Sequence, residues 1–274
     1  MRRETLCILS AALAVSLSAC AGVGDGKGEG SGSITTTAAV EPVEAKVNKS
    51  ELSHEKHGYG QGVQFDSENR PQGALDLNAA CGKLGAKAIN EDTDKITLTF
   101  DQGYENGFTM QILDTLKEKN VKATFFLVQD YAERNPEIVK RMIEDGHTVA
   151  NHSVHHYSMP DLDEEQCRSE IMDFHEYMKS NFGVEMTEFR PPMGEYSDFS
   201  LAVTKDCGYE TVLWSFAYAD WDVNAQPDPK AALEKLTNAA HPGAIYLLHS
   251  VSQTNANVLG DMIDAIRARG FEFE

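Results

Sequence analysis

From Glu91 onward, segments with the pattern of short apolar strands alternate along the chain with segments that have the pattern of amphipathic helices. The expected strands are rich in β-branched and aromatic residues, and the expected helices carry apolar residues three and four positions apart. Such alternation is typical of α/β proteins, in which a helix returns the chain to the same end of a parallel sheet after each strand. The pattern leaves open whether the sheet is open or closes into a barrel. The expected strands are 96–101, 121–128, 148–150, 211–216 and 244–248, and the expected helices are 106–119, 136–144, 164–181, 229–240 and 257–269.

The first of these strands, 96–101, ends in a carboxylate. Its apolar residues alternate with threonines, Asp101 follows, and Gly103 then ends the strand. In α/β proteins the carboxyl ends of the strands carry functional sites, because the loops there vary while the sheet holds their roots rigidly. A single aspartate before a glycine can equally be a turn or helix-capping residue. The function of Asp101 therefore depends on what other segments bring to the same edge.

Two further segments bring histidines. His152 and His156 are four residues apart, a spacing that places two imidazoles on one face of a helical turn, as metal ligation requires. The apolar strand 244–248 is followed by His249, just as the first strand ends in Asp101. A histidine pair alone is weak evidence for a metal site, and the combination with two strand-end groups is much stronger.

Five segments resemble, in order, the motifs of the polysaccharide deacetylases with a NodB homology domain, carbohydrate esterase family 4. They are Thr99-Phe100-Asp101-Gln102-Gly103, His152-Ser153-Val154-His155-His156, Arg190-Pro191-Pro192-Met193-Gly194, Asp220-Trp221 and Leu247-Leu248-His249. The resemblance spans residues 90–274. Segments 99–107, 214–221 and 241–243 are further similar to the δ-lactam-biosynthetic branch, which acts on muramic acid in peptidoglycan. The resemblance to the family implies an α/β fold, namely a distorted, incomplete (β/α) barrel with the site at the carboxyl ends of the strands.

The resemblance also implies a reaction, the hydrolysis of an N-acetyl group on a glycan, and a role for individual residues. Asp101 corresponds to the general base that takes a proton from water, and His249 to the general acid that protonates the departing amine. Arg190 corresponds to a residue beside the base carboxylate that keeps it ionised. Asp220 matches a residue that contacts the acid histidine.

By the same resemblance, His152 and His156 hold a divalent metal ion, zinc or alternatively cobalt, manganese or nickel, which activates water and polarises the acetyl carbonyl. Most of the family has a second aspartate at the position of Gln102, where it is the third metal ligand. The neutral amide of Gln102 is a weaker ligand, so lower metal affinity is expected, and the alternative is an ion held by the two histidines and water molecules. The muramic branch also has a neutral amide here, although it is asparagine. The side chains expected to shape the substrate pocket are Trp221, Leu247 and Met193.

The N-terminal region has the layout of an export signal followed by a tether. Two arginines precede an apolar run from Leu6 to Leu17, and residues 17–20 resemble a bacterial lipobox with Cys20 as the lipidated residue. An ordinary secretory signal with an incidental Cys20 is the alternative. We therefore expect a lipoprotein signal at 1–20, a flexible tether at 21–56, an N-terminal arm at 57–90 and the catalytic domain at 91–274. The expected location is the outer face of the cell membrane.

Net charge and cysteine usage restrict the partners. The formal net charge of −19 argues against nucleic acid, because phosphate binding requires clustered lysine and arginine. Cys81, Cys167 and Cys207 show no C-x-x-C spacing that would suggest a structural zinc site. The sequence leaves open whether any two of them pair, and buried free thiols are the default expectation. The function predicted is metal-dependent deacetylation of N-acetylmuramic acid in peptidoglycan by a monomer. The alternatives are deacetylation of N-acetylglucosamine in peptidoglycan or another glycan, and a glycan-binding pseudoenzyme in which Gln102 has silenced the site.

Overall fold

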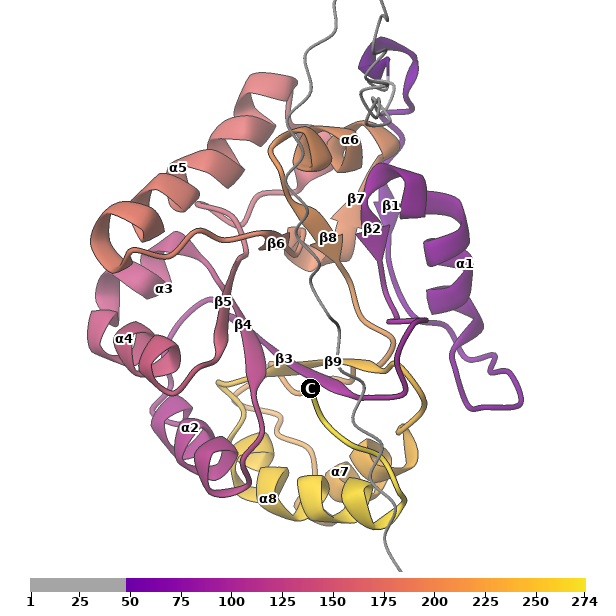
Figure 1. Ribbon diagram of the computed structural model, residues 1–274, viewed down its shortest axis with the longest axis vertical. Helices are drawn as coiled ribbons and strands as arrows, with labels where there is room; N and C mark the ends of the chain where they lie inside the picture. Colours follow the sequence, from indigo (N-terminus) through magenta and orange to yellow (C-terminus); the bar gives the residue numbers. More distant parts are fainter. Residues whose placement is uncertain (1–47) are drawn as a thin grey trace, which may run out of the picture. The chain divides into compact units, whose positions relative to one another are not determined.

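The structure is a computed structural model that describes residues 48–274. Within this part of the chain, seven parallel strands form one sheet in the order β2-β8-β6-β5-β4-β3-β9, with helices around its outer side (Figure 1). The strands are β2 (Ala86–Lys87), β3 (Thr97–Gln102), β4 (Ala123–Leu127), β5 (Thr148–Asn151), β6 (Glu188–Phe189), β8 (Glu210–Val212) and β9 (Ile245–His249). A separate antiparallel pair joins β1 (His57–Gly58) to β7 (Glu195–Tyr196).

The sheet curves into an incomplete barrel, as expected, and the chain beyond β8 brings its two sides together. After Val212 the backbone leaves β8, and Phe216 bridges to Tyr246 of β9 in parallel. The backbone N–H of Leu247 donates to the carbonyl oxygen of Phe216 at 2.8 Å. The strand expected at 211–216 therefore ends at Val212, and residues 213–216 instead connect β8 to the far side of the sheet.

Eight α-helices lie in the described residues. They are α1 (Gln72–Cys81), α2 (Thr109–Glu118), α3 (Gln129–Arg134), α4 (Pro136–Glu144), α5 (Glu164–Phe182), α6 (Asp198–Asp206), α7 (Pro229–Asn238) and α8 (Gln253–Ala268). Short 3₁₀ turns occur at Lys49–Glu51, Gly82–Leu84, Met159–Asp161 and Pro192–Gly194. In the described part of the chain, no helix has the length and apolar character needed to cross a membrane.

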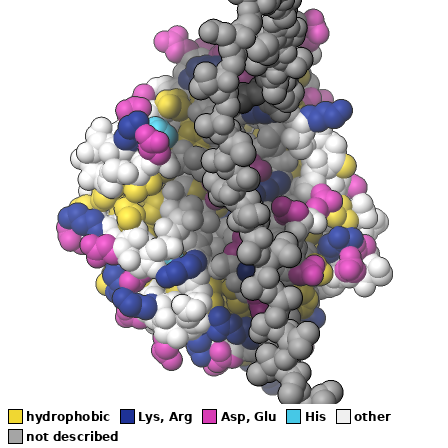
Figure 2. All heavy atoms as spheres, in the orientation of Figure 1, with side chains coloured by type: hydrophobic (Ala, Val, Ile, Leu, Met, Phe, Trp, Pro, Cys, Tyr) yellow, Lys and Arg dark blue, Asp and Glu magenta, His cyan; other side chains and the backbone are white. Residues whose placement is uncertain are grey.

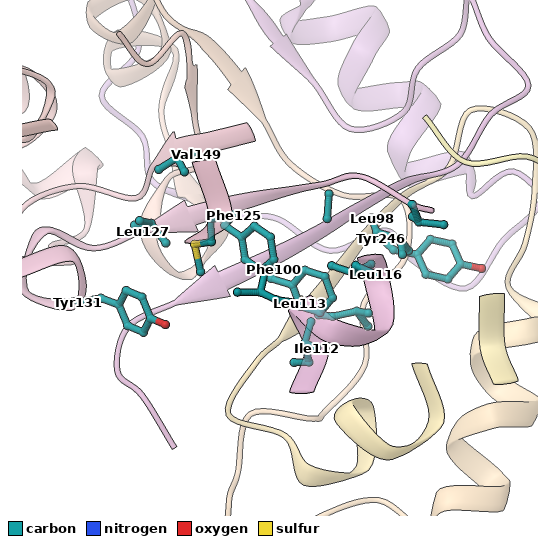
Figure 3. Packing of buried hydrophobic residues seen from close by; sticks show 14 of the residues in the cluster. Leu98, Phe100, Ile112, Leu113, Leu116, Phe125, Leu127, Tyr131, Val149 and Tyr246 are labelled. Atoms are coloured by element: carbon teal, nitrogen blue, oxygen red, sulfur yellow. The ribbon is translucent and has the colours of Figure 1, made fainter. Parts of the chain in front are cut away.

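The main hydrophobic core lies between the strands and the helices on their outer side. Phe100 of β3 and Phe125 of β4 stack with ring centroids 5.2 Å apart, and both are fully buried. Leu113 and Leu116 of α2 pack against these strands (Figure 3). Because strand residues alternate between the two faces, burying Leu98 and Phe100 on the outer side leaves Thr99 and Asp101 facing the barrel interior.

The N-terminal part of the described chain is joined closely to the sheet. Residues 57–90, which the sequence suggested as an arm, include β2, whose residues pair in parallel with β8. Before this segment, Lys49 forms ion pairs with Glu164 of α5 and Asp206 of α6. The signal, Cys20 and most of the tether lie outside the described residues.

Acidic and basic side chains are interspersed over the face shown in Figure 2. Several acidic and basic side chains of the described residues form ion pairs. Arg141, for example, contacts Asp145 at 2.7 Å and Asp114 at 2.8 Å. Exposed pairs of this kind contribute little to stability individually. Cys81 and Cys167 are buried free thiols and Cys207 is a half-buried one, so the expected thiol state is confirmed in the structure.

Candidate active site

Asp101 ends β3 on the inside of the barrel, where a fully buried arginine contacts it. Arg190, which follows β6, donates from Nη1 to Asp101 Oδ1 at 2.7 Å and to Thr99 Oγ1 at 2.7 Å. Its Nε donates to the carbonyl oxygen of Val212 at 2.9 Å and its Nη2 to that of Leu213 at 3.0 Å. Every nitrogen of the guanidinium thus has an acceptor, which compensates the burial of the charge.

This arrangement decides the charge of the carboxyl group. Burial acts to raise the pKa of Asp101, but the positive charge of Arg190, the nearby His152 and His249 and the hydrogen bond from Arg190 together outweigh burial, so the pKa lies below its ordinary value. Asp101 is therefore ionised at neutral pH. Its second oxygen, Oδ2, lies 3.6 Å from Nε2 of His152.

His152 and His156 follow β5 in a tight loop. The expected helical turn is wrong, because Ser153 has φ of 72° and His156 has φ of 60°, both in the left-handed region. The Ser153 hydroxyl accepts a hydrogen bond from the backbone N–H of His156 at 2.8 Å, which holds this turn. The two imidazoles nevertheless meet, with ring centroids 4.9 Å apart and planes at 76°.

Both imidazoles are held in the neutral form that binds metal ions. Burial lowers the pKa of His152 to about 4, and burial also lowers the pKa of His156. Nδ1 of His152 lies 2.7 Å from the carbonyl oxygen of Arg190. Only a protonated Nδ1 can make that hydrogen bond, so the lone pair of this ring is on Nε2, the nitrogen nearest to Asp101.

The loop that carries the histidine pair is fixed from α5 by Glu170, which the sequence did not single out. The buried carboxylate of Glu170 accepts from the backbone N–H of His155 at 2.8 Å and contacts Nδ1 of the same residue at 2.6 Å. The carbonyl oxygen of Glu170 accepts from the N–H of Val154 at 3.1 Å. A buried acidic residue on an otherwise amphipathic helix was the available signal.

His249 ends β9 and is held by Asp220. Nδ1 of His249 lies 2.7 Å from Asp220 Oδ1, and its backbone N–H donates to Oδ2 at 2.8 Å. Asn255 of α8 also donates to Asp220 Oδ2, at 2.5 Å, and the Tyr218 hydroxyl donates to Asn255 Oδ1. Burial acts to lower the pKa of His249, but the hydrogen bond and the charge of Asp220 raise it above its ordinary value. Asn255 and Tyr218 were not predicted, since no local pattern marks them.

These groups open into one pocket. Asp101, His152, His156 and His249 all line a cavity of ≈ 620 Å³ and, on its other side, a smaller hollow of ≈ 380 Å³. The remaining expected pocket residues are also present at the larger cavity, where Leu247 is buried while Trp221 and Met193 are more than half exposed. The sequence did not identify Tyr59 and Gln61, which form part of its wall.

Gln102 is fully buried and does not line either cavity. Its Nε2 donates to Ser250 Oγ at 2.6 Å, whereas its Oε1 has no hydrogen-bond partner among the described residues. Within residues 48–274, no three His, Cys, Asp or Glu side chains form a metal-binding group. Two neutral imidazoles beside a carboxylate, with an unsatisfied amide oxygen on the residue next to Asp101, still form a donor set that fits a divalent metal ion with open positions.

Comparison with known proteins connects this site to a family. Residues 88–212 match the family model described as polysaccharide deacetylase. The chain is 39% identical over 206 residues to the peptidoglycan-N-acetylmuramic acid deacetylase PdaA of Bacillus subtilis (strain 168), covering 74% of this chain and 78% of that protein. It is 32% identical over 184 residues to a peptidoglycan-N-acetylglucosamine deacetylase of Bacillus cereus, covering 65% of this chain and 84% of that protein. The solved structure of Bacillus subtilis PdaA, described as a family 4 carbohydrate esterase, matches with a TM-score of 0.76 at 36% identity, over 81% of this chain and 96% of that chain.

Proposed function

Because this chain belongs to the polysaccharide deacetylase family, we propose that it hydrolyses the N-acetyl group of N-acetylmuramic acid residues in peptidoglycan. One observation carries the proposal: Asp101 and His249 are register partners on the adjacent strands β3 and β9, and both line the same pocket. An ionised carboxylate and an imidazole of raised pKa thus face one substrate from neighbouring strand ends. That is the arrangement that amide hydrolysis by general base and general acid requires.

In the first step, the carboxylate of Asp101 accepts a proton as water attacks the acetyl carbonyl carbon. Arg190 keeps this carboxylate ionised and fixes its orientation through the 2.7 Å hydrogen bond to Oδ1. Oδ2 is left directed toward the histidine pair. The base is thereby presented with one oxygen engaged by the protein and the other available to the reacting water.

In the second step, the bond from the carbonyl carbon to the sugar nitrogen breaks, and His249 gives that nitrogen a proton. Asp220 raises the pKa of His249, so the imidazole holds its proton near neutral pH. The contact of Nδ1 with Asp220 leaves Nε2 as the nitrogen that donates. The products are acetate and a free sugar amine, which can close on the lactyl carboxyl of muramic acid to give the δ-lactam.

His152 and His156 would hold the divalent metal ion, either with water molecules in its open positions or with Oε1 of Gln102 as a third ligand. When bound, the ion would lower the pKa of a water molecule and would act as a Lewis acid toward the acetyl carbonyl. The chemistry of two imidazoles favours zinc, with cobalt, manganese and nickel as alternatives. Leu247, Trp221 and Met193 would receive the acetyl methyl group and the sugar face.

The second candidate is deacetylation of N-acetylglucosamine, and a specific observation favours it. Among the described residues, the lining of the ≈ 620 Å³ cavity includes no lysine or arginine that could pair with the lactyl carboxylate of muramic acid. A relative from Bacillus cereus is also named for the glucosamine reaction. A glycan-binding pseudoenzyme is disfavoured, since the residues proposed as base and acid, the arginine and both histidines are all present.

Product analysis separates these candidates. The metal-loaded full chain is incubated with peptidoglycan glycan strands, with and without stem peptides, and the acetyl content of each sugar is measured by mass spectrometry. Loss of acetyl from muramic acid is the expected result. Loss from glucosamine alone would establish the second candidate, and no loss with zinc, cobalt, manganese or nickel would establish the pseudoenzyme.

The enzyme would act at the outer face of the cell membrane as a monomer. The support for this placement is the signal-like residues 1–20 with Cys20 at the lipobox position. A lipid-anchored domain on a polar tether could reach an insoluble polymer without leaving the cell surface.

A further inference from the structure

A second cavity of ≈ 590 Å³ adjoins the catalytic pocket on the side away from Tyr104. This side cavity shares Gln61 and Ala217 with the catalytic pocket, and it shares no lining residue with the ≈ 380 Å³ hollow. The three spaces therefore follow one another, with the catalytic groups in the middle. The lining residues that matter below are Val63, Phe65, Ala231, Lys235 and Asn238.

One wall of the side cavity is a loop between β1 and α1, and it is held rigidly. Oδ1 of Asp66 accepts from the backbone N–H of Arg70 at 2.9 Å, while Nε of Arg70 donates to Oδ2 at 2.8 Å. Nδ2 of Asn69 donates to the carbonyl oxygen of Asn238 at 3.0 Å, which ties the loop to the end of α7. These side-chain contacts fix the position of Phe65, which directly precedes the turn.

The same loop presents large apolar side chains to solvent. Val63 is 89% exposed and Phe65 is 56% exposed. Exposed apolar side chains on a rigid segment beside a cavity indicate a binding surface, because side chains left in water do not stabilise the fold. Across the cavity, α7 contributes the exposed polar side chains of Glu234, Lys235 and Asn238. The cavity thus has an apolar aromatic wall facing a polar one.

The floor of the side cavity is structural and offers no further catalytic group. Nδ1 of the buried His241 donates to the carbonyl oxygen of Ala239 at 2.7 Å, so its Nε2 accepts from the Ser215 hydroxyl at 2.8 Å. Ser215 Oγ in turn accepts from the N–H of Ile245 at 2.9 Å. The polar side-chain atoms of His241 and Ser215 thus all have hydrogen-bond partners. Burial lowers the pKa of His241, which keeps its imidazole neutral. The cavity is therefore suited to binding rather than to chemistry.

We propose that the side cavity is a subsite for the sugar next to the reacting one along the glycan strand. This inference rests on the proposed function, because a polymer whose acetyl group lies in the central pocket must continue out of it. The ring of Phe65 would pack on the apolar face of the pyranose, while Lys235 and Asn238 would hydrogen-bond its hydroxyl and acetamido groups. The loop lies before residue 88, where the match to the family model begins.

Binding measurements on the metal-stripped full chain test the subsite without turnover. N-acetylmuramic acid methyl glycoside and a peptide-free peptidoglycan tetrasaccharide are titrated and their dissociation constants compared by NMR. We expect the tetrasaccharide to bind at least tenfold more tightly. Phe65→Ala, and separately Ala231→Trp, which fills the cavity from α7, should each reduce that ratio by about fivefold or more. Met110→Ala, which removes an exposed apolar side chain far along the chain on α2, is the control and should leave the ratio unchanged.

Equal affinities for the two sugars, or a ratio that both cavity variants preserve, would overturn the subsite. A gain in affinity that appears only when the monosaccharide carries its stem peptide would also overturn it, because the occupant would then be peptide. Failure of the proposed function looks different: the metal-loaded chain would release no acetate although the length-dependent binding and its loss in the variants remained.

Discussion

Asp101 and Arg190 form a buried pair in which the arginine has other acceptors and the aspartate is the proposed general base. We expect Asp101→Asn to lower the deacetylation rate by about 10³-fold, because the amide cannot accept the proton of the attacking water. Arg190 keeps Thr99 Oγ1 and two carbonyl oxygens as acceptors, so the free energy of unfolding should fall by only about 1–3 kcal/mol. Acetate release and thermal unfolding measure the two effects.

Thr99→Val is the matched control for this change. It removes another acceptor of the same guanidinium at a buried position, so it should cost comparable stability while retaining most of the activity. If Asp101→Asn kept the wild-type rate, or if both variants lost activity equally, Asp101 would not be the base.

A second prediction follows from the raised pKa of His249 and concerns the dependence of the deacetylation rate on pH. An acid must be protonated, so kcat/KM should fall as pH rises through the pKa of His249, which Asp220 holds above 6.5. Asp220→Asn removes the cause of the rise and leaves burial, which lowers the pKa. The alkaline limb of the profile should therefore move to lower pH, with a loss of rate at its maximum.

The raised pKa of His249 also makes the stability of the folded protein depend on pH, in a defined direction. Because the folded-state pKa of His249 is raised, its contribution to stability is fully present below about pH 6.5 and is lost as pH rises through the folded pKa. The stability difference between wild type and Asp220→Asn should thus narrow as pH rises, down to the part that comes from the other hydrogen bonds of Asp220. An alkaline limb that stays in place in Asp220→Asn would contradict the role of His249 as the acid.

A substitution of Gln102 tests the metal site by measuring zinc binding instead of activity. Gln102→Glu keeps the length of the side chain and replaces a neutral amide by a carboxylate, a stronger ligand for a divalent cation. We expect zinc affinity, measured by competition with a chelating dye, to rise about tenfold or more. In the presence of excess chelator the variant should unfold at a lower temperature than wild type, because the added charge is buried. Unchanged zinc affinity with the same loss of stability would remove Gln102 from the ligand set.

At the scale of elements, Gly243 joins the start of β9 to the segment before β3. It has φ of 69°, and a Cβ atom there would lie 1.9 Å from the carbonyl oxygen of Asn90, whose own N–H donates to the Gly243 carbonyl. Gly243→Ala should therefore combine backbone strain with a clash and cost more than about 3 kcal/mol. Gly208→Ala is the control, because Gly208 has φ of 85° and open space at the Cβ position, so only strain of about 1 kcal/mol is expected. Equal losses in chemical denaturation would show that strain alone acts at Gly243.

The elements that the sequence predicted well are those whose limits are set by local chemistry. The helix expected at 136–144 matches α4, because Pro136 fixes its first turn and Gly146 with φ of 76° follows its end. The helix expected at 257–269 is α8, which begins at Gln253 because Ser252 caps it through the N–H of Asn255. Two buried positions in its first turn, Thr254 and Asn255, are polar, so the pattern of large apolar residues starts too late to reveal the start of the helix.

Elements defined by distant contacts were not predictable in this way. β2 and β6 have two residues each, too few for a period, and they exist because neighbouring strands pair with them. The crossing of residues 213–216 to β9 likewise depends on the curvature of the whole sheet. The site shows the same division: the residues of the five motifs were found, whereas Tyr59, Gln61 and Glu170 reach it or its loop through tertiary packing alone.

At the scale of the whole molecule, the fold gathers groups that are far apart in sequence onto one edge. Asp101, His152, Arg190 and His249 come from four different strand ends, and Asp220 comes from the long connection between β8 and α7. The barrel also places Arg190 behind Asp101, where its charge acts on the carboxyl and not on solvent. Activity therefore depends on the integrity of the sheet, and variants such as Gly243→Ala should lose activity in parallel with folded protein.

The last prediction concerns where this molecule is held. If Cys20 is the lipidated residue, the exported chain should fractionate with membranes, label with a fatty-acid analogue, and be shortened at its N-terminus up to Cys20. Cys20→Ser should abolish labelling and release the chain from the membrane fraction, while the catalytic groups, all at residue 101 or later, keep their activity on soluble glycan strands. Deacetylation of intact cell walls by the producing cells should fall, because the anchor and the polar tether keep the enzyme close to an immobile substrate. A Cys20→Ser chain that stays on the membrane would show that an uncleaved segment, or a surface of the folded part, holds the protein there instead.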